Sequence, residues 1–388
     1  MSNDTLPEIR FPGFTDDWEQ RKLGEIVQIT MGQSPNSENY TENPEDYILV
    51  QGNADMKNNR VVPRVWTTQI TKQAEKGDLI LSVRAPVGDI GKTDYDVVLG
   101  RGVAAIKGND FIFQQLGKMK ESGYWNRFST GSTFESINSN DIREALITIP
   151  TGEEQQKIGN FFKQLDDTIT LHQRKLDLLK ETKKGFLQKM FPKNGAKVPE
   201  IRFPGFTKDW EERKLGDVFS ERSERSSEGE LISVTINSGV IKASELDRKD
   251  NSSDNKSNYK KVEVGDIAYN SMRMWQGASG YSSYEGILSP AYTVIIPKEG
   301  TDSKFFAYDF KRYDMIQTFK RNSQGLTSDT WNLKFPTLKL VKIMVPSIEE
   351  QKQIAAFFER LDNTIALHER ELDVLKETKK GFLQKMFV

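Results

Sequence analysis

The sequence contains no cysteine and only two histidines among its 388 residues. The lack of cysteine excludes disulfide bonds, thiolate zinc sites and cysteine nucleophiles, and it predicts a reducing compartment. There is no apolar run of membrane-spanning length, and the first residues lack the basic and apolar regions of a signal peptide. We therefore expect a cytoplasmic protein that has no membrane partner.

Catalytic motifs are also missing. The sequence contains no GxxxxGK[ST] phosphate loop, no dinucleotide-binding glycine fingerprint, no Asn-Pro-Pro-aromatic run of amino-methyltransferases and no histidine–cysteine cluster. Asp78 and Asp266 each follow a glycine at the start of an expected strand, which is typical of turn residues rather than acid–base catalysts. We expect a non-catalytic chain that binds no metal and no cofactor itself.

An excess of positive charge is missing as well. The net charge is −1, with 13 Lys and Arg against 15 Asp and Glu in residues 27–152, and 18 against 16 in residues 219–348. A protein that holds DNA alone usually carries a clear basic excess. If nucleic acid is the target, a partner supplies much of the phosphate contact.

What the chain does have is a duplicated plan. Residues 7–15 reappear as 199–207, and residues 153–191 reappear as 349–387 with 28 of 39 positions identical. The inserts between these blocks differ, and the second is four residues longer. This pattern predicts one fold that presents two different surfaces.

The long repeated blocks have the spacing of coiled-coil helices. Apolar residues recur at heptad positions over about five heptads, which predicts that each helix packs along one stripe. Thr151 with Glu154, and Ser347 with Glu350, form the pattern of a capping box at the start of each helix. The seam residues expected to contact a partner helix are Phe162, Leu165, Ile169, His172, Leu176, Leu179, Phe358, Leu361, Ile365, His368, Leu372 and Leu375.

The natural partner of each helix is the other copy. Because the second insert follows the first helix, the second helix most simply runs back, which predicts an antiparallel pair with a pseudo-two-fold axis. At 1.5 Å per residue each helix spans roughly 55 Å. The C-terminus should then return close to the N-terminal block.

Two interpretations apply to the histidines, which occupy equivalent seam positions. His172 and His368 could form a metal pair or a pH sensor. A polar register device within the coiled coil is the interpretation that we favour, and Lys183 and Lys379 are interpreted in the same way.

The inserts have the pattern of mixed α/β domains, so the predicted fold class is α+β: two globular mixed α/β domains separated by two long antiparallel coiled-coil helices. Strands are expected at 77–83, 102–106 and 146–150, with a helix at 111–128; the second insert matches with 265–269, 291–297, 342–346 and a helix at 305–320. The polar stretch 221–258 is expected to be a mobile loop. The predicted domains are 1–152, 153–192, 193–348 with its connector, and 349–388.

Glycine-rich loops in both inserts concentrate side chains suited to DNA. Arginine reads guanine and Asn or Gln reads adenine through paired hydrogen bonds, while Ser and Thr suit phosphates. The alternative is that the aromatic residues fill local cores while the polar ones form turns. The candidate DNA-binding residues are Arg84, Lys92, Arg101, Ser132, Thr133 and Phe134 in the first insert, and Asn270, Arg273, Trp275, Gln276, Tyr281, Asn322, Gln324, Thr327 and Ser328 in the second.

Several of these motifs resemble one known family. They are the RKLG of each half, GDIAYNSMRMWQGASG at 265–280, SPAY at 289–292, PSIEEQKQIAAFF at 346–358 and the helix end KKGFLQKMF. With the duplicated plan they make the chain similar to the DNA-specificity subunit of type I restriction–modification systems. The first insert has SVRAPVGD where the second has YNSMRMW, so the loop residues do not correspond one to one.

This resemblance implies two target-recognition domains, each of which reads one half of a split, asymmetric site in double-stranded DNA, while the helices set the unread spacer. It also implies assembly with two methyltransferase (modification) subunits and with restriction/translocase subunits, which would hold S-adenosylmethionine, ATP and magnesium. The alternatives are a stand-alone DNA-binding regulator, which the charge balance disfavours, and a coiled-coil scaffold without a DNA role. A nuclease or methyltransferase is disfavoured by the missing motifs.

Overall fold

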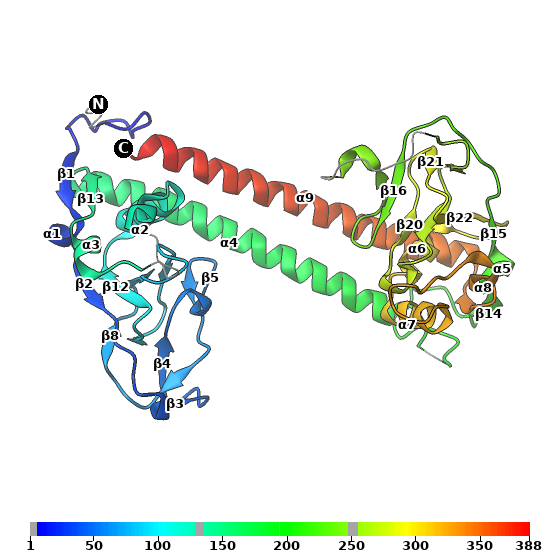
Figure 1. The fold of residues 1–388 in the computed structure, drawn as a ribbon, viewed down its shortest axis with the longest axis horizontal. Helices are drawn as coiled ribbons and strands as arrows, with labels where there is room; N and C mark the ends of the chain where they lie inside the picture. The colour runs from blue at the N-terminus through cyan, green and yellow to red at the C-terminus, as the bar shows by residue number, and fades with distance from the viewer. Residues whose placement is uncertain (1–5, 129–135, 194, 247–254) are drawn as a thin grey trace. The chain divides into compact units, whose positions relative to one another are not determined.

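The computed structural model describes residues 6–128, 136–193, 195–246 and 255–388 (Figure 1). The chain divides into two compact units, Met1–Lys175 with Glu369–Val388, and Leu176–His368. Each unit holds one mixed α/β domain together with a segment of each long helix, α4 (Gly152–Lys189) and α9 (Ile348–Met386). The expected fold class is confirmed, although the units cut across the helices that the sequence set apart as separate segments.

The domain of the first unit is built on a six-stranded sheet in the order β2-β12-β9-β10-β6-β5. Its central strand, β9, is buried on both faces, which explains its apolar run. The helix α2 (Asp110–Glu121) contributes Phe111 and Leu116 to the same core. A five-stranded sheet, β3-β7-β4-β11-β8, completes the domain. The strands are β2 (Gln28–Met31), β3 (Tyr40–Thr41), β4 (Tyr47–Val50), β5 (Met56–Lys57), β6 (Arg60–Val61), β7 (Trp66–Thr67), β8 (Lys72–Ala74), β9 (Leu79–Ser82), β10 (Ile90–Lys92), β11 (Val97–Leu99) and β12 (Val103–Lys107).

The domain of the second unit contains a four-stranded sheet in the order β15-β22-β19-β20, which corresponds to β2-β12-β9-β10 of the first domain. These strands stand in the same chain order as β2, β12, β9 and β10, so one topology underlies both inserts. The hairpin β16–β17 and the antiparallel pair β18–β21 pack beside it. The strands are β15 (Phe219–Glu221), β16 (Ile232–Thr235), β17 (Gly239–Lys242), β18 (Lys260–Val262), β19 (Ile267–Asn270), β20 (Ser279–Tyr281), β21 (Gly286–Leu288) and β22 (Tyr292–Pro297).

A small antiparallel pair closes each insert where it begins and ends. In the first unit β1 (Glu19–Lys22) pairs with β13 (Leu146–Ile149), and in the second β14 (Glu211–Lys214) pairs with β23 (Lys342–Val345). The RKLG motif forms the end of the first strand of each pair and the start of the short helix that follows. Because its two ends are tied together, each insert can differ in sequence without disturbing the repeated helices.

The helix segments run antiparallel within each unit. In the first unit the rings of Phe161 and Phe382 lie 5.1 Å apart, and Asp166 contacts Lys379 at 2.6 Å, so residue numbers rise on α4 as they fall on α9. In the second unit the rings of Phe186 and Phe357 lie 5.1 Å apart and Lys183 contacts Asp362 at 2.5 Å, so the helices run in opposite directions there too. All twelve seam residues named above are buried or half-buried.

The repeated blocks meet each other in both units, which explains why both are repeated. The backbone N–H of Ile9 donates to the carbonyl of Lys385, and that of Ile201 donates to Lys189, each at 2.9 Å. The expected return of the C-terminus to the N-terminal block is therefore confirmed within the first unit, where the two chain ends are marked in Figure 1.

Three local expectations are wrong. Residues 221–258 are not simply a loop, because β16 and β17 form a hairpin whose Ile232, Val234 and Val240 are buried in alternation. The helix expected at 305–320 is broken into α6 (Ser303–Asp309) and α7 (Tyr313–Asn322). The carboxylates of the expected capping boxes do not cap.

Those carboxylates bind arginines of the short repeated block instead. Glu154, whose side chain is fully buried, accepts two hydrogen bonds from Arg10 at 2.7 and 2.8 Å. Glu350 accepts two from Arg202, both at 2.7 Å. We call these two ion pairs the arginine clasps; they anchor the N-terminal block of each half to the first turn of its long helix.

Candidate nucleic-acid interface

In both domains a segment that precedes a short helix reaches the same end of the central strand, which is β9 in the first domain and β19 in the second. In the first, the N–H of Ile137, just before α3 (Ser139–Arg143), donates to the carbonyl of Val83 beyond β9 at 3.0 Å. In the second, Leu333, just before α8 (Phe335–Leu338), donates to Ser271 beyond β19 at 2.8 Å. One scaffold therefore brings the segment before a short helix to the same strand end in both domains, although the two segments that meet are far apart in sequence.

In the second domain two tryptophans join the loops. The rings of Trp275 and Trp331 lie 5.2 Å apart edge to face, and the indole N–H of Trp275 donates to the carbonyl of Met272 at 3.0 Å. Lys320 lies over the ring of Trp331 at 5.6 Å. Trp275 thus fits the alternative in which the aromatic residues form a local core, and it holds the polar residues around it in place.

The surface beside this pair carries the remaining candidates of the 270–276 loop. The side chain of Arg273 is exposed, and Gln276 is half-buried. Asn270 uses its side-chain oxygen to accept the N–H of Met272 at 3.0 Å, so it shapes the turn.

The second loop, residues 322–331, is ordered by its own hydrogen bonds. Gln324 and Asn332 exchange backbone bonds of 3.0 and 2.8 Å, and the hydroxyl of Thr330 donates to the carbonyl of Thr327 at 2.9 Å. Gly325 has φ +150°, and a Cβ there would lie 2.6 Å from the Thr330 carbonyl, so only glycine fits. The loop exposes Gln324, Thr327 and Ser328, while the side-chain N–H of Asn322 donates to the carbonyl of Thr318 within α7.

In the first domain the structure gathers two of the candidate arginines. Arg84, beyond β9, is exposed and pairs with Ser136 as an isolated bridge. The N–H of Val83 donates to the carbonyl of Gly102 at 2.9 Å, which brings exposed Arg101 to the same edge. Ser132, Thr133 and Phe134 lie outside the described residues.

Two candidates lie at the opposite end of the central strand. Lys92 pairs with Leu79 at the start of β9, and Tyr281 pairs with Ile267 at the start of β19. Lys92 contacts Asp110 at 3.0 Å, and the ring of Tyr281 lies 5.3 Å from the ammonium of Lys304. Neither side chain joins the paired loops.

Residues that the sequence did not single out also stand at the loops. Leu326 is fully exposed at the tip of its loop, Met272 is 42% exposed, and Ser34 accepts the N–H of Arg101 at 3.1 Å. An apolar residue next to glycine inside a polar loop was the available signal for Leu326. No sequence signal connected Ser34 with Arg101, which is 67 positions away.

Within the described parts of the chain, no helix is both long and apolar enough to cross a membrane. Of the polar seam residues, His172 lies with its Nδ1 3.6 Å from Glu371, and Lys183 pairs with Asp362 at 2.5 Å.

The fold and its paired loops define a duplicated protein with two domains of one topology. A family model described as the type I restriction modification DNA specificity domain matches residues 15–181 and 207–377. Because these stretches cover most of both halves, the chain belongs to this family.

Three relatives come from Methanocaldococcus jannaschii. A protein named as the type I restriction enzyme MjaX specificity subunit is 32% identical over 44% of this chain and 41% of its own length. The MjaIX specificity subunit is 25% identical over 53% and 52%, and the MjaVIII specificity subunit is 23% identical over 95% and 91%. The chain thus spans about half or less of the length of the first two relatives.

Solved structures share the fold. The crystal structure of a type I restriction–modification system S subunit from M. genitalium matches with a TM-score of 0.66 and 16% identity over 99% of both chains. A chain from a structural study of complex assembly and conformational transition of the type I R-M system matches with 0.52 and 18% over 98% and 99%. These likenesses support the architecture described above.

Proposed function

We propose that this chain is the non-catalytic DNA-recognition subunit of a type I restriction–modification complex, and that each domain reads one half of a bipartite, asymmetric site in double-stranded DNA. The observation that carries the proposal is the shared strand end: beyond β9 Arg84 is exposed with Arg101 of the turn before β12 beside it, and beyond β19 Arg273 is exposed with Gln324 of the 322–331 loop nearby. Arginine and amide side chains on ordered loops are suited to base edges. Such a role requires a location in the cytoplasm, with the DNA.

The long helices would set the spacer and dock two methyltransferase subunits. In support, each unit exposes a pair of apolar side chains on its helix segments: Leu171 and Val374, both 65% exposed, in the first, and Leu178 and Leu367, 67% and 54% exposed, in the second. Exposed apolar side chains that gather in a patch mark protein–protein contacts, so these pairs on the helix segments are candidates for one. S-adenosylmethionine, ATP and magnesium would be held by the methyltransferase and restriction/translocase subunits.

The test is methylation-site mapping in a host that expresses the chain with its methyltransferase. Replacing residues 272–276 by the residues of another recognition loop should change one half-site and leave the other unchanged, because the loop belongs to one domain. The matched variant Arg84→Ala should affect only the other half-site. A simultaneous change of both halves by either variant would contradict the assignment of one domain to one half.

A stand-alone DNA-binding regulator and a coiled-coil scaffold remain the rivals. The first requires strong DNA binding by the isolated chain, and the second predicts that loop variants have no effect on methylation. A gel-shift assay with and without the methyltransferase separates them, because the proposal expects binding that depends on the partner.

A further inference from the structure

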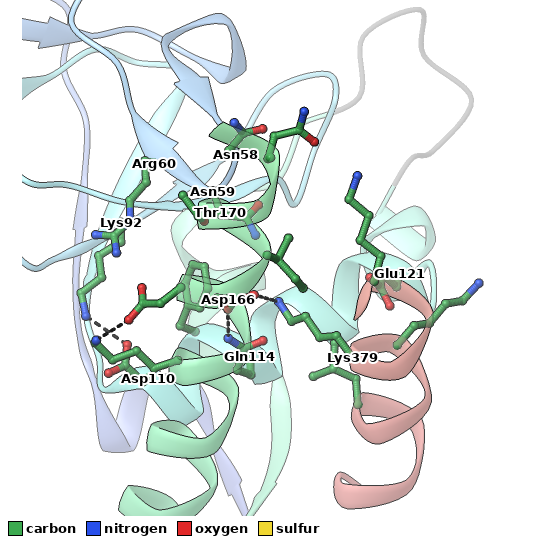
Figure 2. A pocket seen from close by; sticks show the side chains of 18 residues that line it. Asn58, Asn59, Arg60, Lys92, Asp110, Gln114, Glu121, Asp166, Thr170 and Lys379 are labelled. Atoms are coloured by element: carbon green, nitrogen blue, oxygen red, sulfur yellow. Dashed lines mark hydrogen bonds and ion pairs between the residues drawn. The ribbon is translucent and has the colours of Figure 1, made fainter. Parts of the chain in front are cut away.

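One carboxylate in the first unit joins the recognition domain to both long helices at once. Asp166 of α4 accepts the side-chain N–H of Gln114 from α2 at 2.7 Å on one oxygen, and its other oxygen contacts the ammonium of Lys379 from α9 at 2.6 Å. Figure 2 shows both contacts converging on Asp166. Gln114 is only 2% exposed, so its amide depends on this acceptor.

The second unit repeats the arrangement with different chemistry. Asp362 of α9 accepts the hydroxyl of Tyr308 from α6 at 2.9 Å on one oxygen, and its other oxygen contacts Lys183 of α4 at 2.5 Å. In both units one carboxylate oxygen therefore faces the domain and the other faces the lysine of the opposite helix. Burial and the nearby Asp362 carboxylate raise the pKa of Tyr308, so its hydroxyl keeps the proton that it donates.

The two donors occupy equivalent positions of the diverged inserts. Gln114 and Tyr308 each stand three residues after a phenylalanine, Phe111 or Phe305, that packs on the equivalent tryptophan with rings 5.7 Å apart. The donor changed from an amide to a phenol while the contact stayed. This points to a requirement for the contact itself, rather than for one side chain.

Two other polar side chains of the first domain each contact only one of the two long helices or its end. The side chain of Asn109 bonds to Gln155 on α4, and Lys118 donates to the carbonyl of Phe387 just beyond α9. Beside Asp166 lies a cavity of about 320 Å³ between the domain and both helix segments (Figure 2), and one of about 280 Å³ lies beside Asp362. Open space next to the carboxylate means that close packing does not resist a small rotation of the domain there.

We propose that Asp166 and Asp362 are positioning residues that fix the angle of each recognition domain on the helix pair, and thereby fix the spacer that the protein accepts. The inference rests on the proposed function. Two charge-assisted hydrogen bonds to one carboxylate are strongly directional, whereas the surrounding apolar contacts are not. Loss of the carboxylate charge would leave the reading loops unchanged but let the domain tilt.

The experiment uses the full chain with its methyltransferase and DNA substrates that carry both half-sites at the native spacing and at one base pair more or less. In Asp166→Asn and Asp362→Asn we expect methylation at the altered spacings to rise roughly three- to tenfold relative to the native spacing, with the half-site sequences unchanged. Asp167→Asn is the matched control, because Asp167 is exposed and pairs with Lys163 on the same helix at 2.8 Å. It should leave the ratio as in the wild type.

Tyr308→Phe is the milder variant, because it removes only the domain's bond to Asp362 and keeps the ion pair with Lys183. It should shift the ratio in the same direction as Asp362→Asn. An equal loss of methylation at all spacings in these variants, or an unchanged ratio, would indicate a merely structural role and overturn the proposal. If the wild type methylated no bipartite site at any spacing, the proposed function would fail and this inference with it.

Discussion

At the scale of single residues, the loop tips divide into side chains that build the loop and side chains that face outward. Trp275, Asn270 and Asn322 are occupied by contacts within the domain. Arg84, Arg101 and Arg273 have exposed side chains. The sequence predicted DNA contacts for both groups, because an amide or an indole side chain can stabilise a turn as well as contact a base.

Leu326 provides a direct test of the outward-facing group. The side chain is fully exposed, so Leu326→Asp should leave the free energy of unfolding within about 0.5 kcal/mol. Under the proposed function it should lower methylation at one half-site about tenfold, because an apolar contact with a base would be lost and a negative charge would face the phosphates. Leu340→Asp, at a leucine that is 58% exposed away from the loop, is the control. Equal effects of both variants on methylation would remove Leu326 from the interface.

The side chain of Lys311 predicts how the stability of the protein depends on pH. Burial lowers its pKa to about 8, while its ammonium donates to the carbonyls of Ile236 and Gly277 at 2.9 and 2.6 Å. Below pH 8 the folded protein carries this buried charge at a cost, and between pH 8 and 10.5 the unfolded chain binds the extra proton, so stability rises with pH. We expect the wild type to gain about 3 kcal/mol relative to Lys311→Met across this range. Chemical denaturation at several pH values measures it, and a constant difference would contradict it.

At the scale of elements, the arginine clasps explain the short repeated block. The sequence PEIRFPGFT has few features of a regular element, yet it supplies the arginine that neutralises a buried glutamate at the start of each helix. The capping-box pattern follows the local rules for a helix start. In the structure, however, each carboxylate binds an arginine of the short repeated block instead of a backbone N–H. Propensity rules for a helix start cannot include an arginine that lies 144 residues away.

Removing the arginine of one clasp should lower the free energy of unfolding, and a second substitution should restore part of it. Arg10→Ala leaves Glu154 buried without its partner and should lower the free energy of unfolding by about 3–5 kcal/mol. Adding Glu154→Gln removes the buried charge and should restore part of the loss. Urea denaturation of the two single variants and the double variant gives the coupling energy. Additive losses would indicate that the two side chains do not act as a pair.

At the scale of the whole molecule, the near-neutral charge and the exposed apolar pairs on the helices favour a chain that acts with partners. Leu171→Asp with Val374→Asp should abolish copurification of a methyltransferase subunit and, with it, most of the DNA binding of the mixture. Asn160→Asp with Asn363→Asp, two exposed positions on the same helices, should leave both unchanged. Retained copurification in the leucine–valine variant would place the docking surface elsewhere.

The sequence by itself determined the duplicated plan, the two long helices and their antiparallel sense, because these follow from identity between copies, heptad spacing and chain order. Hydrophobic alternation in 232–242 was present but was masked by the polar composition around it. Only the tertiary structure decided which loops meet, which candidates lie at the far end of the central strand, and that Gln114 and Tyr308 serve one contact. Those facts depend on strand register and on contacts between distant residues, which local patterns do not encode.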